Sequence, residues 1–312
     1  MDVDVSSAPS TPQCANCGAA LLPDDRYCEQ CGRRLAAGEQ ADAGSAGTAR
    51  DARQEIDLAV AGGVSERGRV RLRNEDAMYL HAVDDRQLVA VVCDGISSSL
   101  SPHVAARRAA SAAGGVLSAA LQDGRANLTD AVTEAVLAAQ QAVIEVRWTA
   151  RSELDAPSCT LVCACCRGSE LAVGWVGDSR AYWIARDGSR QLTVDHSWVQ
   201  DQVAAGVLDA RSAESDPRAH EVTRWLGRDA PSEMPPVVTM RPAQPGQLVL
   251  CSDGVWNYLP EPNQIAVVID RLPSGAAPIA AARSLADTAF HAGGRDNITT
   301  AVVNVPRESD HP

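Results

Sequence analysis

Acidic side chains directly follow several apolar runs of this sequence, at places where a strand would end. Asp94-Gly95 follows VAVVC, Asp253-Gly254 follows LVLCS, and Asp178 follows ELAVGWVG. A strand end aims a carboxylate in a fixed direction, and the glycine after it lets backbone or water approach closely. Taken singly, an Asp-Gly pair is more often an ordinary turn than a ligand.

Two further acidic motifs are Glu75-Asp76 in RLRNED and Asp296 in RDN. With five such motifs in one chain, metal ligands become a better explanation than ordinary turns. If the strands converge, several like charges lie close together, which is tolerable mainly when cations neutralise them. Ligands that are all oxygen favour Mg²⁺ or Mn²⁺ over zinc. The sequence therefore predicts a divalent-cation centre, and such a centre can activate water for hydrolysis.

A second group of metal-ligand candidates lies near the N-terminus, with the spacing Cys14-x2-Cys17-x10-Cys28-x2-Cys31. Four thiolates in two pairs predict one structural zinc ion, with no position left open for catalysis. The alternative, unligated cysteines in an unfolded head, is disfavoured because only a metal would hold so short a segment folded. Acidic and basic residues are balanced here, which favours a protein-docking role over nucleic-acid contact.

Composition narrows the class of protein. The chain has 312 residues, a formal net charge of −12 and a pI near 4.9, which disfavours nucleic-acid binding. No apolar stretch is long enough to span a membrane, and the N-terminus has no signal-peptide pattern, so we expect a cytoplasmic protein without membrane contact. All 28 basic residues are arginine and alanine is abundant, which indicates a bacterial source.

The pattern along the chain predicts a large domain at 56–306, preceded by a disordered N-terminus at 1–13, a zinc ribbon at 14–35 and a flexible linker at 36–55, and followed by a tail at 307–312. Apolar runs predict strands, and helical spacing of Ala, Leu and Val predicts helices. The expected strands are 57–64, 87–94, 160–166, 170–177, 180–185, 247–253 and 297–305, and the expected helices are 102–121, 127–148, 198–205 and 276–291. Because strands and helices come in separate groups, layered sheets are favoured over a doubly wound parallel sheet.

The order of the motifs resembles the PP2C (PPM-type) family of metal-dependent serine/threonine protein phosphatases. The matching segments are GRVRLRNEDA, VCDG, VGDSRAY, QLTVDHS, TRWLG, CSDG and GGRDNIT, between about Ile56 and Val305. The resemblance implies an α+β fold, a four-layer αββα sandwich of two antiparallel β-sheets flanked by helices, with the zinc ribbon appended.

The resemblance also implies a role for each matching residue. Asp94 would bridge two metals, with Gly95 adding its carbonyl, and Asp253 and Asp296 would complete one of them. Glu75 and Asp76 would serve the other metal, directly or through water. Asp178 would help to hold a third, weaker metal. Arg71 would grip the substrate phosphate with its planar guanidinium.

The implied function is hydrolysis of phosphoserine and phosphothreonine in proteins by a water bridging two Mg²⁺ or Mn²⁺ ions, opposing a bacterial Ser/Thr kinase. Expected partners are phosphorylated proteins, that kinase, and a protein docked on the ribbon. The chain departs from the family in DGISSS, where Ile96 cannot donate a proton. Two alternatives therefore stay open, a catalytically weak pseudophosphatase and a phosphoprotein-binding regulatory scaffold. His196, in QLTVDHS, is expected to be a structural hydrogen-bonding residue.

Overall fold

The computed structural model describes residues 53–124, 127–148, 156–209, 218, 221–231 and 233–306. The predicted zinc ribbon with its four cysteines, the N-terminus, most of the linker and the tail lie outside these described residues. Within the described ranges, no helix is both long enough and apolar enough to cross a membrane.

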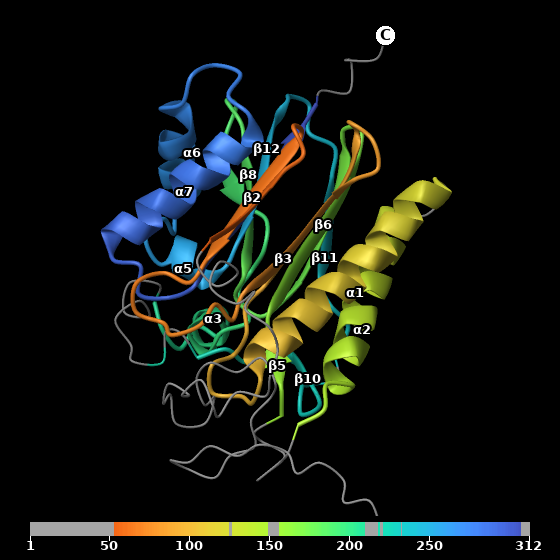
Figure 1. The fold of residues 1–312 in the computed structure, drawn as a ribbon, viewed down its shortest axis with the longest axis vertical. Helices are drawn as coiled ribbons and strands as arrows, with labels where there is room; N and C mark the ends of the chain where they lie inside the picture. Colours follow the sequence, from red (N-terminus) through yellow and green to blue (C-terminus); the bar gives the residue numbers. More distant parts are fainter. Residues whose placement is uncertain are drawn as a thin grey trace, which may run out of the picture. The chain divides into compact units, whose positions relative to one another are not determined.

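Two antiparallel sheets form the centre of the fold (Figure 1). The six-stranded sheet has the order β1 (Arg53–Asp57), β2 (Ala61–Glu66), β13 (Ile298–Val305), β12 (Gly246–Cys251), β8 (Arg180–Ile184), β9 (Arg190–Gln191). The five-stranded sheet has the order β11 (Val237–Met240), β7 (Glu170–Val176), β6 (Leu161–Arg167), β4 (Gln87–Cys93), β3 (Ala77–Ala82). A short pair, β5 (Ser158–Cys159) with β10 (Leu226–Gly227), forms a separate two-stranded sheet.

Helices cover the outer face of each sheet (Figure 1). On the five-stranded sheet lie α1 (Pro102–Asp123) and α2 (Leu128–Ile144), and on the six-stranded sheet lie α6 (Pro262–Asp270) and α7 (Pro278–Ala292). The short helices α3 (Trp198–Ala204) and α5 (Asp253–Trp256) follow strand ends. The predicted four-layer αββα sandwich is thereby confirmed.

The central strands are apolar on both faces because both faces are buried. In β4, Val89, Val91 and Cys93 pack under the helices α1 and α2, whereas the alternate residues Leu88, Ala90 and Val92 pack between the sheets. A strand turns successive side chains to opposite faces, so a strand inside four layers needs apolar residues at every position.

Several elements differ from the sequence expectation, which did not include the strands β3 and β11 or the short elements β5, β9, β10 and α5. The run 57–64 was predicted as one strand, and this was wrong, because a turn with Ala59 at φ 63° divides it into the β1–β2 hairpin. Helix α6 was not predicted. Its start is marked by Pro262 and by a capping box between Glu261 and Gln264. The apolar stretch that follows in the helix is short, so its spacing alone did not predict a helix.

Candidate active site

The register of the five-stranded sheet brings two of the predicted site residues together. Ala77 at the start of β3 pairs with Cys93 at the end of β4. Asp76 and Asp94 are the next residues beyond this pair, so they leave the sheet at the same edge. The adjacent end of β7 leads into Asp178, since β6 pairs with both β4 and β7.

The six-stranded sheet sends its acidic residues to the same edge. Cys251, at the end of β12, pairs with Thr300 near the start of β13 and with Arg180 at the start of β8. Asp253 therefore lies just after the end of β12, and Asp296 lies just before the start of the neighbouring strand β13. Ser252 links the two sheets here, because its hydroxyl donates a 2.8 Å hydrogen bond to Oδ2 of Asp76.

Two glycines of the acidic motifs are required by close packing. A Cβ at Gly254 would lie 1.9 Å from the Asn297 carbonyl oxygen, and one at Gly95 would lie 2.8 Å from the Glu75 carbonyl oxygen. The space beside these glycines is filled by neighbouring protein backbone. Gly95 therefore lets the loop that carries Asp94 pack against Glu75, and Gly254 lets the loop that carries Asp253 pack against the segment after Asp296.

Asp94 lies at the electrostatic centre of the acidic cluster. Burial raises the pKa of its carboxyl well above the ordinary value, and the charges of Asp76, Asp253, Asp296 and Asp178 raise it further. The residue keeps some accessible surface. Its backbone is fixed by Thr160, whose N–H donates to the Asp94 carbonyl at 2.7 Å and whose hydroxyl accepts from the Asp94 N–H at 3.1 Å.

The pKa values of the neighbouring carboxyl groups are raised for the same two reasons, burial and nearby negative charge. Burial raises the pKa of Asp76 to about 7 and that of Asp253 to about 6, and nearby carboxylates add to both shifts. Burial also raises the pKa of Asp178 well above its ordinary value. Buried Oδ1 atoms of Asp76 and Asp253 accept no hydrogen bond from the described residues.

These observations fit a divalent-cation site. A hard cation stabilises buried carboxylates that repel one another and whose oxygens lack hydrogen-bond donors. A ligand set made only of oxygen atoms suits Mg²⁺ or Mn²⁺. Among the described residues, no three acidic, histidine or cysteine side chains are already arranged around one point at ligand distances.

Arg71 is held between two loops at the rim of the acidic cluster. Its Nη2 donates to Oδ2 of Asp296 at 2.5 Å, and its Nη1 donates to Oγ of Ser97 at 3.0 Å. The Ser97 hydroxyl in turn donates to Oε2 of Glu75 at 2.7 Å. The chain of contacts from Glu75 through Ser97 and Arg71 to Asp296 fixes the plane of the guanidinium.

Two residues in this arrangement were missed by sequence reasoning. Ser97 lies in DGISSS, the segment that departs from the family pattern, and no spacing signal marks its contact with Arg71. Asn297 lies in the GGRDNIT motif, which by itself predicts no separate role for it. Its Oδ1 accepts from the Glu75 N–H at 2.8 Å, while its Nδ2 donates to the carbonyls of Arg67 and Arg73 at 2.9 and 2.8 Å. Asn297 therefore fastens the loop that carries Arg71 and Glu75.

His196 has the structural role expected from the sequence. Its Nδ1 accepts from the Gly177 N–H at 3.0 Å, and its Nε2 lies 3.1 Å from Nη1 of Arg224. Burial, with the nearby Arg224 charge, lowers the pKa of its imidazole to about 4. A neutral ring that accepts from a backbone N–H fixes the turn before Asp178.

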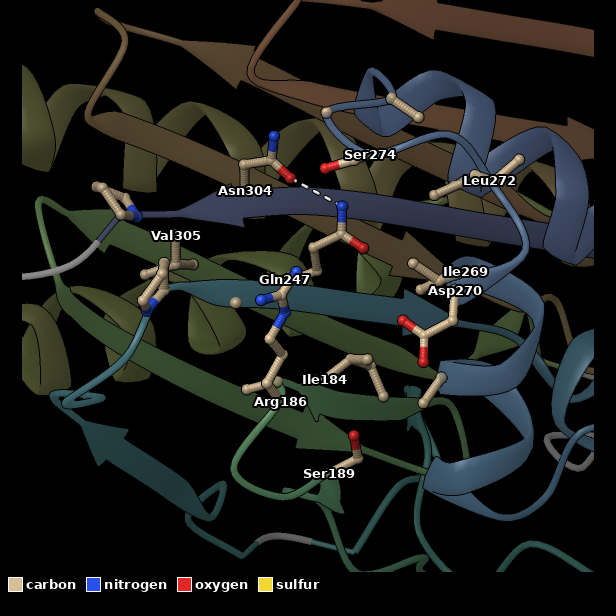
Figure 2. A pocket seen from close by; sticks show the side chains of 18 of the residues that line it. Ile184, Arg186, Ser189, Gln247, Ile269, Asp270, Leu272, Ser274, Asn304 and Val305 are labelled. Carbon is tan, nitrogen blue, oxygen red and sulfur yellow. Dashed lines mark hydrogen bonds between the residues drawn. The ribbon is translucent and has the colours of Figure 1, made fainter.

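A large pocket of about 1480 Å³ is lined by none of the residues of the acidic cluster. Figure 2 shows side chains that line this pocket. It is lined by the other ends of the strands, including Ile184 of β8, Gln247 of β12 and Asn304 of β13. The Gln247 side-chain amide donates to Asn304 at 2.9 Å. Because the acidic residues lie at the opposite ends of β12 and β13, size alone does not identify the active site of this fold.

Comparison with known proteins identifies a family for most of the chain. The family model for protein phosphatase 2C matches residues 65–288, and a zinc-ribbon domain model matches residues 13–35. The serine/threonine phosphatase stp of Listeria innocua is 34% identical over 244 residues, which cover 77% of this chain and 93% of that protein.

Solved structures are similar as well. The crystal structure of a bacterial serine phosphatase has a TM-score of 0.69 at 22% identity and covers 80% of this chain and 98% of its own, which supports the fold. The catalytic domain of the phosphatase PstP, solved with 2 manganese ions, has a TM-score of 0.58 at 25% identity and covers 78% of this chain and 97% of its own. With the relatives and the family model in agreement, the chain belongs to the protein phosphatase 2C family of serine/threonine phosphatases.

Proposed function

We propose that this protein hydrolyses phosphoserine and phosphothreonine in proteins, with two Mg²⁺ or Mn²⁺ ions held by the acidic cluster and a third, weaker ion held with the help of Asp178. The observation that carries the proposal is the position of Asp94, surrounded by four other carboxyls at one edge of both sheets. Such an arrangement is costly without cations and therefore supports a metal-dependent activity.

The proposed ligands divide by the loop that carries them. Asp94 would serve both principal cations, with the Gly95 carbonyl beside it. Asp253 and Asp296 would complete one site, and Glu75 and Asp76 the other. When bound, the cations would acidify an attacking water and offset charge on the phosphoryl group.

Arg71 would bind the substrate phosphate. A guanidinium can bond two phosphate oxygens at once, and each terminal nitrogen of Arg71 carries a second N–H beyond the one used in the observed contacts. Ser97 and Asp296 hold the plane of the group before substrate arrives, so less conformational freedom is lost on binding. Ile96 has no proton to give, so the leaving hydroxyl would take its proton from water in the site.

The direct test is release of phosphate from a phosphothreonine peptide by the full chain, with Mn²⁺ varied and with a chelator as control. We expect turnover that requires Mn²⁺ or Mg²⁺. Tight peptide binding without turnover under every metal condition would instead establish the pseudophosphatase or scaffold alternative.

Ser97→Ala is expected to raise the KM for a phosphopeptide about fivefold, with a smaller effect on kcat. The reason is that a hydrogen bond to a charged group contributes on the order of 1 kcal/mol at a partly exposed site. Ser97→Thr keeps the hydroxyl and should restore the lower KM. Ser98→Ala, at the exposed neighbouring position, is the matched control. Equal KM values for Ser97→Ala and Ser98→Ala would show that Ser97 does not position Arg71.

The raised carboxyl pKa values predict how stability depends on pH without divalent cations. Between the ordinary Asp pKa of 3.8 and the folded values of about 7 for Asp76 and about 6 for Asp253, the folded protein binds more protons than the unfolded chain. Its free energy of unfolding should therefore fall as the pH rises through this window.

In EDTA we accordingly expect a Tm several degrees lower at pH 7.5 than at pH 5.5. Added Mn²⁺ should stabilise the protein most at pH 7.5, where the carboxyls are ionised. Asp76→Asn, which cannot ionise, should show a smaller difference between the two pH values. A chelated wild-type protein that is more stable at pH 7.5 than at pH 5.5 would contradict the buried-carboxyl assignment.

The physiological setting is part of the same proposal. The enzyme would act on cytoplasmic phosphoproteins and oppose a bacterial Ser/Thr kinase. The family-model match at 13–35 supports a ribbon with one structural zinc on Cys14, Cys17, Cys28 and Cys31. That ribbon would dock a protein partner, since its charges are balanced and do not favour phosphate backbones.

A further inference from the structure

A concentrated basic segment lies beside the proposed phosphate site. Residues 67–73, RGRVRLR, carry four arginines and no acidic residue, in a chain with 28 basic and 40 acidic residues. Arg71 is the proposed phosphate ligand. The exposed Arg69, two residues away, has no place in that function, nor does the exposed Arg295 that precedes Asp296.

A contact between two loops places Arg69 close to Arg295. The Arg69 N–H donates to the Gly294 carbonyl at 2.7 Å, and the Arg295 N–H donates to the Tyr258 hydroxyl at 3.2 Å. The Arg69 guanidinium carbon lies 4.6 Å from the centroid of the Phe290 ring. Stacking on an aromatic ring restrains the side chain and leaves its N–H groups at the edge able to bind anions.

Other charged groups of the two loops are engaged elsewhere. Arg67 donates to the Leu72 carbonyl, and Arg73 contacts His103. The carboxylates of Glu75 and Asp296 contact Ser97 and Arg71. The ion pairs formed between described residues include neither Arg69 nor Arg295. Two exposed arginines, one two residues from Arg71 and the other next to Asp296, are therefore without an acidic partner from the described part of the chain.

We propose that Arg69 and Arg295 form a second anion-binding patch, which selects phosphoprotein segments that carry acidic residues next to the phosphorylated residue. The inference rests on the proposed function and adds a substrate class to it. An exposed charge pair contributes modestly and is weakened by salt, so we expect a preference of about two- to fivefold for each arginine at low ionic strength.

The test compares two phosphothreonine peptides that differ only in their flanks, glutamates in one and glutamines in the other. The measured quantity is the ratio of their kcat/KM values at saturating Mn²⁺ in low salt. Because both peptides are assayed on the same protein sample, the ratio does not depend on the fraction of protein that is folded. Wild-type protein should favour the acidic peptide, and about 0.5 M NaCl should reduce the ratio toward one.

Arg69→Gln and Arg295→Gln should each lower the ratio about two- to fivefold, and the double variant should lower it further. Arg186→Gln removes an exposed arginine that lines the pocket of Figure 2, and it should leave the ratio unchanged. A wild-type ratio near one, or equal ratios in wild type and the double variant, would overturn the patch while phosphatase activity stands. Hydrolysis of neither peptide would overturn the proposed function, and the substrate class with it.

Discussion

Asp94→Asn is expected to lower phosphatase activity at least about a hundredfold at every Mn²⁺ concentration. Loss of a supporting residue around a metal site typically costs 10- to 100-fold, and loss of a ligand shared by two ions should cost more. Asparagine has nearly the same shape but no charge, so the variant tests the charge itself. The measurement is phosphate release from a phosphothreonine peptide over a wide range of Mn²⁺ concentration.

Unfolding would not explain this loss. Burial and four neighbouring carboxyls all disfavour ionised Asp94, so removing its charge should not lower the Tm of the chelated protein. Asp187→Asn, in the exposed turn after β8, is the matched control and should retain full activity. Near-normal turnover by folded Asp94→Asn protein would remove the assignment of the acidic cluster as the metal site.

Arg71→Ala is expected to raise the KM for a phosphopeptide about 10- to 100-fold. Bonds between an ionised donor and an ionised acceptor contribute about 1.5–3 kcal/mol, which corresponds to this range. Arg71→Lys keeps the charge but not the planar pair of donors, so it should give an intermediate KM.

Metal dependence separates substrate binding from metal binding in this variant. Arg71 contacts Asp296 in the structure, so its removal frees a carboxylate oxygen and should not raise the Mn²⁺ concentration needed for half-maximal activity. Arg186→Ala, at the opposite ends of the strands, should match wild type in both quantities. A large rise in the Mn²⁺ requirement with an unchanged KM would mean that Arg71 organises the metal site and does not hold phosphate.

The layered fold was predictable because the sequence carries local signals for it. Runs such as LVAVVC are apolar at successive positions, which suits a strand buried on both faces, and long Ala-rich segments suit helices that pack closely on a sheet. At Gly114 in α1 a Cβ would lie 2.3 Å from the Tyr79 ring, so this helix approaches β3 closely. The β1–β2 hairpin was missed because its turn, Leu58 to Val60, is apolar and runs on into the buried strand β2, whereas β1 (RQEID) is mostly polar and gives no apolar strand signal.

The candidate site, like the fold, was predictable from the sequence only in part. The sequence by itself determined the kinds of candidate ligand, since Asp94, Asp253 and Asp296 carry carboxylates in short motifs whose order resembles one family. Only the tertiary structure decided that these motifs meet, because antiparallel register places strand ends from distant parts of the chain at one edge. It also decided that Ser97 contacts Arg71 and that Arg69 lies beside Arg295. Such contacts join residues 26 or more than 200 positions apart, and they depend on loop packing that leaves no periodic signal in the sequence.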